Sequence, residues 1–206
     1  MEDLPRIAIT MGDPAGVGPE IIVKIFQDES VHEFCHPLVV GDAACLRKTA
    51  VQFAPSVSVR PITSPEEALF IPGTLDVLNL GSIPASLPIG QPGAEGGKVA
   101  IEHIRTAVDL ALSQRVDAIT TAPINKESIH RAGFAYPGHT ELLAEYTGAE
   151  NVALMLAGDV LRVVLVTTHV PLDAVKPLIT RERVATILRL THRWLIDHVT
   201  ESPRIA

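Results

Sequence analysis

Short apolar runs alternate with polar turns and helical patterns through the first 80 residues of the chain. Four of these runs have the length and aliphatic content of buried strands: residues 6–10, 37–40, 56–60 and 74–80. Between the first two runs, apolar side chains repeat at helical spacing from Ile21 to Phe26. Asp42 is placed to cap a helix that reaches about Ala50, and Ser64-Pro65-Glu66-Glu67 has the form of a capping box. Strands that alternate with helices in this way predict an α/β fold around a parallel sheet.

The same alternation continues to the end of the chain. The predicted helices cover residues 97–114, 126–131 and 141–146 and start again at Thr180, and the predicted strands cover residues 117–120, 152–156 and 161–166. A short link of the kind found in hairpins joins the last two strands. His103 and Arg105 fall outside the apolar stripe of the first of these helices, so we expect both side chains on the surface.

The composition changes between residues 81 and 97, where Pro, Gly and Ser become frequent. Such a stretch is typical of a long loop or a domain crossing. We therefore predict an N-terminal α/β domain in residues 1–90 and a second α/β domain in residues 91–206, each represented in part.

Three polar segments follow the strands and short helices of the second half: residues 121–126, 137–141 and 167–171. The first and the last come directly after runs that we expect to be buried strands. Ligands collect at the carboxyl ends of strands in an open parallel sheet, because loops converge there and helix N-termini present free N–H groups. These segments are therefore the candidates for chemistry.

Individual residues in the three segments have alternative interpretations. Lys126 could hold a phosphate or carboxylate, and a solvated lysine explains it equally well. His139 and Thr140 place an imidazole and a hydroxyl at a predicted helix N-terminus, where N–H groups favour an anion, although Thr140 could act only as an N-cap. A single histidine at a strand end, such as His169, is more often structural than a metal ligand.

A glycine-rich turn over residues 11–20 joins the first strand to the first helix. The turn lacks the Gly-Lys-Ser/Thr ending of a Walker loop and the spacing of a Rossmann fingerprint. Taken alone, it is most simply a tight connection.

The composition limits the classes of partner. The chain has 206 residues, a hydrophobic content of 47% and a formal net charge of −7, and it contains no basic run, so a nucleic-acid-binding surface is not expected. No apolar run approaches the roughly 20 residues of a membrane helix. Cys35 and Cys45 form no C-x-x-C pair, and residues 1–5 do not resemble a secretion signal. We expect a cytoplasmic protein that binds neither nucleic acid nor membranes.

Four segments together resemble one family. TMGDPAGVGPE, TAPINKE, YPGHTE and TTHVPL occur in the order typical of the 4-hydroxythreonine-4-phosphate dehydrogenase family of pyridoxal phosphate biosynthesis. The first segment also resembles the GDGIGPE opening of isocitrate and isopropylmalate dehydrogenases. The resemblance implies the two-domain α/β/α architecture of those enzymes, incomplete in this chain.

The resemblance also implies site residues and cofactors. It assigns His139 and Thr140 to substrate binding and His169 to a divalent metal, which would be Zn, Mg or Co. The cofactor would be NAD or NADP. The residues expected to line the cleft are Asp13, Gly16, Gly18, Asn125 and Lys126.

The implied reaction is oxidation of the secondary alcohol of 4-phosphohydroxy-L-threonine, followed by decarboxylation, in a homodimer with shared active sites. In the family, further metal-binding histidines and phosphate-binding basic residues follow a segment like residues 203–206, so we expect this chain to be inactive alone. A dehydrogenase of a phosphorylated four-carbon sugar acid and a non-catalytic dimerisation module are the alternatives. A phosphate acyltransferase of related fold is disfavoured by His169.

Overall fold

The computed structural model describes residues 4–81, 83–84 and 86–206. Two compact units divide the chain between Glu141 and Leu142. This division differs from the predicted one after residue 90, because the helix and strand that follow residue 90 pack onto the N-terminal sheet. The loop that was expected to cross between domains therefore leads back to the same sheet.

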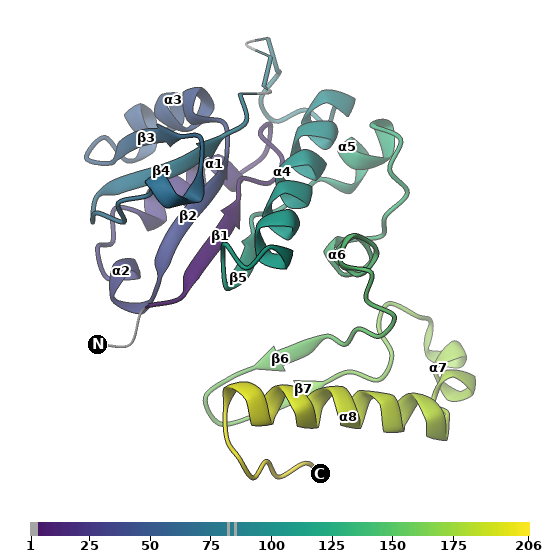
Figure 1. Ribbon diagram of the computed structural model, residues 1–206. Helices are drawn as coiled ribbons and strands as arrows, with labels where there is room; N and C mark the ends of the chain where they lie inside the picture. The colour runs from purple at the N-terminus through teal and green to yellow at the C-terminus, as the bar shows by residue number, and fades with distance from the viewer. Residues whose placement is uncertain (1–3, 82, 85) are drawn as a thin grey trace. The chain divides into compact units, whose positions relative to one another are not determined.

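The first unit is built on five parallel strands (Figure 1). They are β1 (Arg6–Thr10), β2 (His36–Gly41), β3 (Ser58–Ile62), β4 (Thr74–Asn79) and β5 (Ala118–Thr121). Their order across the sheet is β3-β4-β2-β1-β5. The predicted α/β class with a parallel sheet is confirmed.

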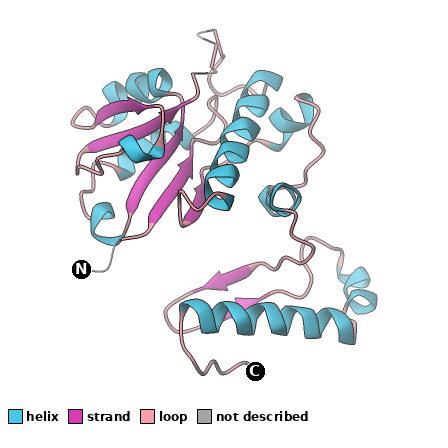
Figure 2. Cartoon of the chain, viewed as in Figure 1, coloured by secondary structure: helices cyan, strands magenta, loops and turns pink. Residues whose placement is uncertain are grey.

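Helices cover both faces of this sheet (Figure 2). On one face, α1 (Gly18–Ile25) and α3 (Ala43–Phe53) bury a cluster that contains Val39 and Val77. On the other face, α4 (Ala94–Leu112) covers Leu38 and Val40. Successive residues of β2 thus point to opposite faces, and both faces are apolar, as the continuous hydrophobic strands predict.

Three short helices complete the first unit: α2 (Val31–Phe34), the 3-10 helix η1 (Pro65–Glu67) and α5 (Lys126–Arg131). The predicted capping box at η1 is wrong. Ser64 makes no capping hydrogen bond, and the Glu67 carboxylate instead accepts hydrogen bonds from the Thr63 amide at 3.3 Å and the Thr63 hydroxyl at 2.6 Å. A three-residue 3-10 turn does not present the free amides of an α-helix to a cap.

The surface position expected for His103 is also wrong, because its side chain is fully buried in α4. This helix packs against β1, β2, β5 and α5, so much more than its apolar stripe is covered. The approach of α5 is close: a Cβ atom at Gly97 would overlap the Ser128 carbonyl. Glycine at position 97 is therefore required by helix packing.

The second unit contains a hairpin and two helices. The strands β6 (Met155–Ala157) and β7 (Arg162–Val164) pair antiparallel, as predicted, and α7 (Leu172–Leu178) and α8 (Arg181–His198) follow. The sequence did not predict α7, which contains Pro177. Helix α6 (His139–Thr147) spans the division between the units. No helix among the described residues has the length and hydropathy needed to span a membrane.

The two strands expected to be buried before polar loops are more exposed than predicted. In β5, Ala118 and Thr120 are exposed because this strand is the edge of its sheet. In β7, which belongs to a two-stranded antiparallel ribbon, Arg162 and Val163 are exposed. The segment 167–171 therefore does not follow a strand of the parallel sheet.

Candidate functional site

Two of the sequence-predicted segments meet at the carboxyl edge of the parallel sheet. The turn after β1 contacts the loop after β5, where the Asp13 amide donates a hydrogen bond to the Pro123 carbonyl at 3.0 Å. The Met11 amide ties the same turn to the neighbouring strand through the Val40 carbonyl at 3.1 Å. Residues 11–18 and 121–126 thus form one continuous edge, as expected for adjacent parallel strands.

Packing explains two glycines of this turn. Gly12 has a positive φ of 72° and faces the Pro123 carbonyl, and a Cβ atom at Gly18 would overlap the Met11 carbonyl. Gly16 is different, because it is exposed and its closest neighbour would be 3.4 Å from an added Cβ atom. Of the two glycines expected to line a cleft, Gly16 is thus open to solvent and Gly18 is enclosed by the protein.

Asp13 is turned into the protein, with only 3% of its surface exposed. One carboxylate oxygen accepts a hydrogen bond from the Ala15 amide at 2.9 Å, and the same oxygen would lie 2.7 Å from a Cβ atom at Gly96. Gly96 belongs to the first turn of α4, where a carboxylate is favoured by the helix dipole. Asp13 therefore joins the glycine turn to α4.

Asn125 and Lys126 lie at the start of α5. The Asn125 side chain accepts a hydrogen bond from the Ser128 amide at 3.0 Å and so caps the helix. The Ser128 hydroxyl in turn accepts a hydrogen bond from the Gly93 amide at 3.2 Å, which connects α5 to the start of α4. Lys126 is exposed at the first residue of the helix.

His139 and Thr140 are the first two residues of α6. Thr140 is exposed and lies within the helix, so the N-cap alternative considered for it is wrong. His139 is half-buried, and its Nε2 atom is buried with no hydrogen-bond partner among the residues that the structure describes. Burial lowers the pKa of His139 and favours the neutral imidazole. Because an unpaired buried polar atom is costly, this nitrogen is a strong candidate for contact with a ligand.

His169 lies in the second unit and is exposed in the loop after β7. Its φ of 56° places it in the left-handed region, which is uncommon for a residue other than glycine and is found disproportionately at functional sites. Within the described part of the chain, no three His, Cys, Asp or Glu residues are grouped to hold a metal ion. A catalytic zinc site commonly uses three protein ligands, so His169 supplies at most part of one.

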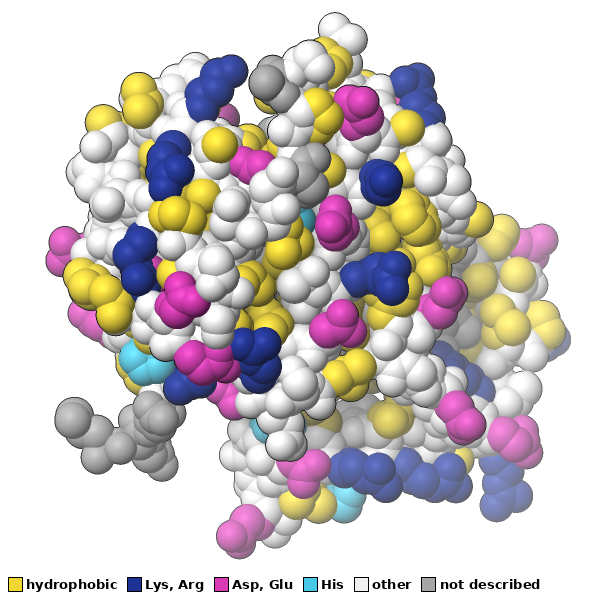
Figure 3. Space-filling model, turned by 45° about the horizontal axis from the view of Figure 1, so that its top comes forward, with side chains coloured by type: hydrophobic (Ala, Val, Ile, Leu, Met, Phe, Trp, Pro, Cys, Tyr) yellow, Lys and Arg dark blue, Asp and Glu magenta, His cyan; other side chains and the backbone are white. Residues whose placement is uncertain are grey.

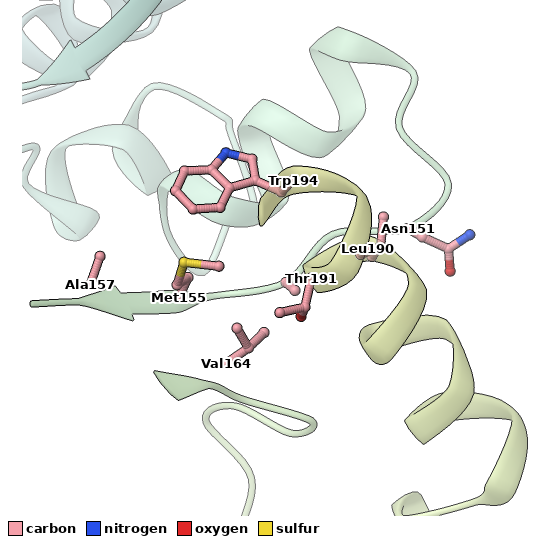
Figure 4. Close-up of a pocket in the computed structure, with 8 residues that line it drawn as sticks. Asn151, Met155, Ala157, Val164, Leu190, Thr191 and Trp194 are labelled. Atoms are coloured by element: carbon pink, nitrogen blue, oxygen red, sulfur yellow. The ribbon is translucent and has the colours of Figure 1, made fainter. Parts of the chain in front are cut away.

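An apolar cavity of about 400 Å³ in the second unit contains none of the predicted site residues. Its lining includes Met155, Val164, Thr191 and Trp194, and Figure 4 shows Trp194 and Thr191 projecting from α8 towards the hairpin. The helical spacing of apolar residues in α8 was the available signal for this surface. On the face shown in Figure 3, Lys and Arg side chains are mixed with Asp and Glu side chains over much of the first unit.

Sequence comparison identifies the family to which these elements belong. Residues 33–206 match the family model of the pyridoxal phosphate biosynthetic protein PdxA. The chain belongs to the PdxA family. It is 47% identical over 174 residues to a D-threonate 4-phosphate dehydrogenase from Cupriavidus necator, a match that covers 84% of this chain and 52% of that protein. It is 43% identical over 205 residues to a 4-hydroxythreonine-4-phosphate dehydrogenase from Trichlorobacter lovleyi, covering 98% of this chain and 61% of that protein.

Solved structures of the PdxA family share the fold. A crystal structure of a 4-hydroxythreonine-4-phosphate dehydrogenase from Burkholderia phymatum superimposes with a TM-score of 0.92 at 43% identity and covers 98% of this chain. The present chain spans 61% of the length of that protein. The predicted resemblance and its α/β architecture are thereby confirmed.

Proposed function

We propose that this chain provides the substrate-binding region of a metal-dependent NAD(P) oxidoreductase. The reaction is oxidation of the secondary alcohol of 4-phosphohydroxy-L-threonine followed by decarboxylation, in vitamin B6 biosynthesis. Membership of the PdxA family supports the proposal. The observation that carries it is the buried, unpaired Nε2 atom of His139 beside the exposed Thr140.

Dehydrogenation of D-threonate 4-phosphate, a phosphorylated four-carbon sugar acid, is the second candidate. It is favoured by the 47% identity to the Cupriavidus necator relative that carries this name. Both substrates are phosphorylated hydroxy acids, so the same binding groups suit either of them. Their affinities for the purified chain distinguish the candidates.

The roles proposed for the residues follow from their protonation states and positions. A neutral imidazole can accept a hydrogen bond from a substrate hydroxyl or donate one to an oxyanion, depending on its tautomer. The Thr140 hydroxyl offers a donor and an acceptor one residue away. Together they would hold the alcohol in one orientation, which lowers the entropy cost of the subsequent transfer.

Family membership implies a nicotinamide cofactor, NAD or NADP, and a divalent metal such as Zn, Mg or Co. The cofactor would supply hydride transfer. His169 is the proposed metal ligand, but the described residues do not complete a metal site around it. Packing within the protein accounts for Asp13 and Gly18. Of the residues expected to line the cleft, Gly16 and Lys126 are exposed and remain open to a ligand.

The assembly and location proposed for the protein are those implied by the family. We expect a cytoplasmic homodimer with shared active sites that binds a phosphorylated small molecule and neither nucleic acid nor membranes. The net charge of −7 agrees with the absence of a nucleic-acid partner. Mass measurement of the native protein tests the dimer.

The binding role of His139 can be tested directly by NMR titration. The purified chain is titrated with 4-phosphohydroxy-L-threonine and, separately, with D-threonate 4-phosphate, and the His139 ring signals are followed. We expect saturable shifts and a loss of affinity of about tenfold in His139→Ala, since one hydrogen bond to a charged or polar ligand contributes about 1.5 kcal/mol. His130→Gln, which changes an exposed histidine of the same unit, is the control.

Formation of NAD(P)H with added divalent metal is measured in parallel with each substrate. We expect no turnover, because the chain is expected to be inactive alone; turnover of either compound would contradict that expectation and identify the substrate. If neither compound shifts the His139 signals, the proposed function is wrong.

A further inference from the structure

A second cavity, of about 430 Å³, lies beside the loop that carries His169. Its polar lining consists of Thr167, Thr168, Thr180 and Arg183, and the other lining side chains are apolar. No Asp or Glu lines it. His169 itself is exposed and does not line the cavity, although its neighbours on both sides do. The cavity is therefore adjacent to the proposed metal ligand and carries a single, positive, formal charge.

Hydrogen bonds hold both the backbone and the side chain of Arg183 in place. Its amide donates a hydrogen bond to the Thr180 hydroxyl at 3.1 Å, which fixes the residue in the first turn of α8. Its Nε atom donates a hydrogen bond to the Val166 carbonyl at 3.2 Å, which fixes the guanidinium against the loop. An arginine bound through Nε to a backbone carbonyl loses less entropy when its terminal nitrogens bind a ligand.

The terminal nitrogens of Arg183 have no carboxylate partner among the described residues. In the first unit, by contrast, Arg60, Arg115 and Arg131 each form an ion pair with an Asp or Glu. Arg183 differs from these because, among the described residues, its side chain donates its one hydrogen bond to a neutral backbone carbonyl. Within the described residues, no carboxylate thus neutralises the positive charge in the cavity.

We propose that this cavity is an oxyanion subsite in which Arg183 binds a phosphate or carboxylate group through its terminal nitrogens. The hydroxyls of Thr167 and Thr168 supply further donors. The free amides at the start of α8 add a favourable dipole to these side chains. A planar guanidinium matches both anions because each presents two oxygens to parallel N–H groups.

The natural source of the oxyanion is the phosphorylated hydroxy acid, and this assignment rests on the proposed function. Such a substrate has a phosphate at one end and a carboxylate at the other. Binding of one end at Arg183 would place the rest of the molecule next to the loop of His169. Arg183 would then orient the substrate and contribute to specificity.

The test uses inorganic phosphate and acetate as separate probes of the purified 206-residue chain. Amide and arginine Nε signals are followed by NMR during each titration. We expect saturable shifts at Thr167, Thr168 and the Arg183 side chain, with at least tenfold weaker binding in Arg183→Gln. Arg183→Lys keeps the positive charge but loses the two parallel N–H donors of the guanidinium, so this variant should bind the probes with intermediate affinity.

Arg181→Gln is the matched control, because Arg181 is exposed two residues earlier on the same helix and does not line the cavity. This variant should bind the probes as the unmodified chain does. Tighter binding of phosphate supports occupation by the phosphate end, and tighter binding of acetate supports the carboxylate end. The proposal fails if neither probe saturates, or if Arg181→Gln weakens binding as much as Arg183→Gln.

Far-UV circular dichroism of the whole chain shows whether the glutamine variant is still folded, and if it is not, Arg183→Lys provides the comparison. The outcomes also separate this inference from the proposed function. Saturable probe binding at Arg183 without a response of His139 to either phosphorylated substrate would support the subsite and reject the dehydrogenase role. A response of His139 to a phosphorylated substrate without probe binding at Arg183 would support the dehydrogenase role and reject the subsite.

Discussion

Replacement of His103 by leucine should change the pH dependence of stability in a defined direction. His103 is fully buried in α4, and neither ring nitrogen has a hydrogen-bond partner among the described residues. Burial lowers the pKa of His103 from 6.5 to about 4, and the nearby Asp42 carboxylate only partly opposes this effect. The folded protein therefore holds a neutral imidazole at pH values where the unfolded chain binds a proton.

The sign and size of the effect follow from linkage. The pKa of His103 in the folded protein is below the unfolded value of 6.5. The free energy of unfolding is therefore unaffected by His103 above pH 6.5, and it decreases as the pH falls from 6.5 towards about 4. The difference between the folded and unfolded pKa values corresponds to about 3 kcal/mol of unfolding free energy, of which about 2.5 kcal/mol should be lost by about pH 4.5. His103→Leu removes this loss, and it also removes two unsatisfied buried nitrogens, each worth about 1 kcal/mol or more.

Urea unfolding followed by circular dichroism at about pH 7.5 and about pH 4.5 provides the measurement. The advantage of His103→Leu over the unmodified chain should grow by about 2–3 kcal/mol between the two pH values. His130→Gln, at an exposed position of the same unit, should show no such growth. Equal losses of stability in His103→Leu and the unmodified chain would show that burial of His103 does not determine its protonation.

Three further substitutions test the packing and the caps, each by urea unfolding. Gly97→Ala should destabilise the first unit by about 2 kcal/mol or more, since its Cβ would overlap the Ser128 carbonyl, whereas Gly93→Ala, with open space around it, should be tolerated. Thr180→Ala should cost about 1 kcal/mol in the second unit, observed through the fluorescence of the single tryptophan, because the cap of α8 is lost. Thr10→Val should be neutral or stabilising by about 1 kcal/mol, because the Thr10 hydroxyl is buried without a partner among the described residues; a large loss would reveal a missed hydrogen bond.

Much of the local structure could be predicted because it depends on neighbours in the sequence. Asp42, Asn125 and Thr180 cap the helices that they precede, through hydrogen bonds that reach three residues along the chain. The hairpin and the five parallel strands follow from apolar runs bounded by turns. The exceptions include the capping box expected at Ser64 and the helix α7, whose internal Pro177 is unfavourable in a helix.

The candidate site was predicted only in part. The motifs pointed to the turn after β1 and the loop after β5, and the structure brings those two segments together. The inward orientation of Asp13 and the exposed position of β7 were not predictable, because each depends on which distant element packs alongside. Arg183 was also missed, since nothing in its neighbouring residues distinguishes it from Arg181.

The sequence by itself determined the alternation of strands and helices, their caps and the family motifs, because periodicity and capping act over a few residues. Only the tertiary structure decided which polar groups lose contact with water. His103 is buried because the sheet and α5 cover α4 from two sides, and the Arg183 guanidinium is partly enclosed because the loop after β7 folds against α8. Burial depends on surfaces contributed by residues far apart in the chain, and burial controls the protonation of His103 and the environment of the free charge on Arg183.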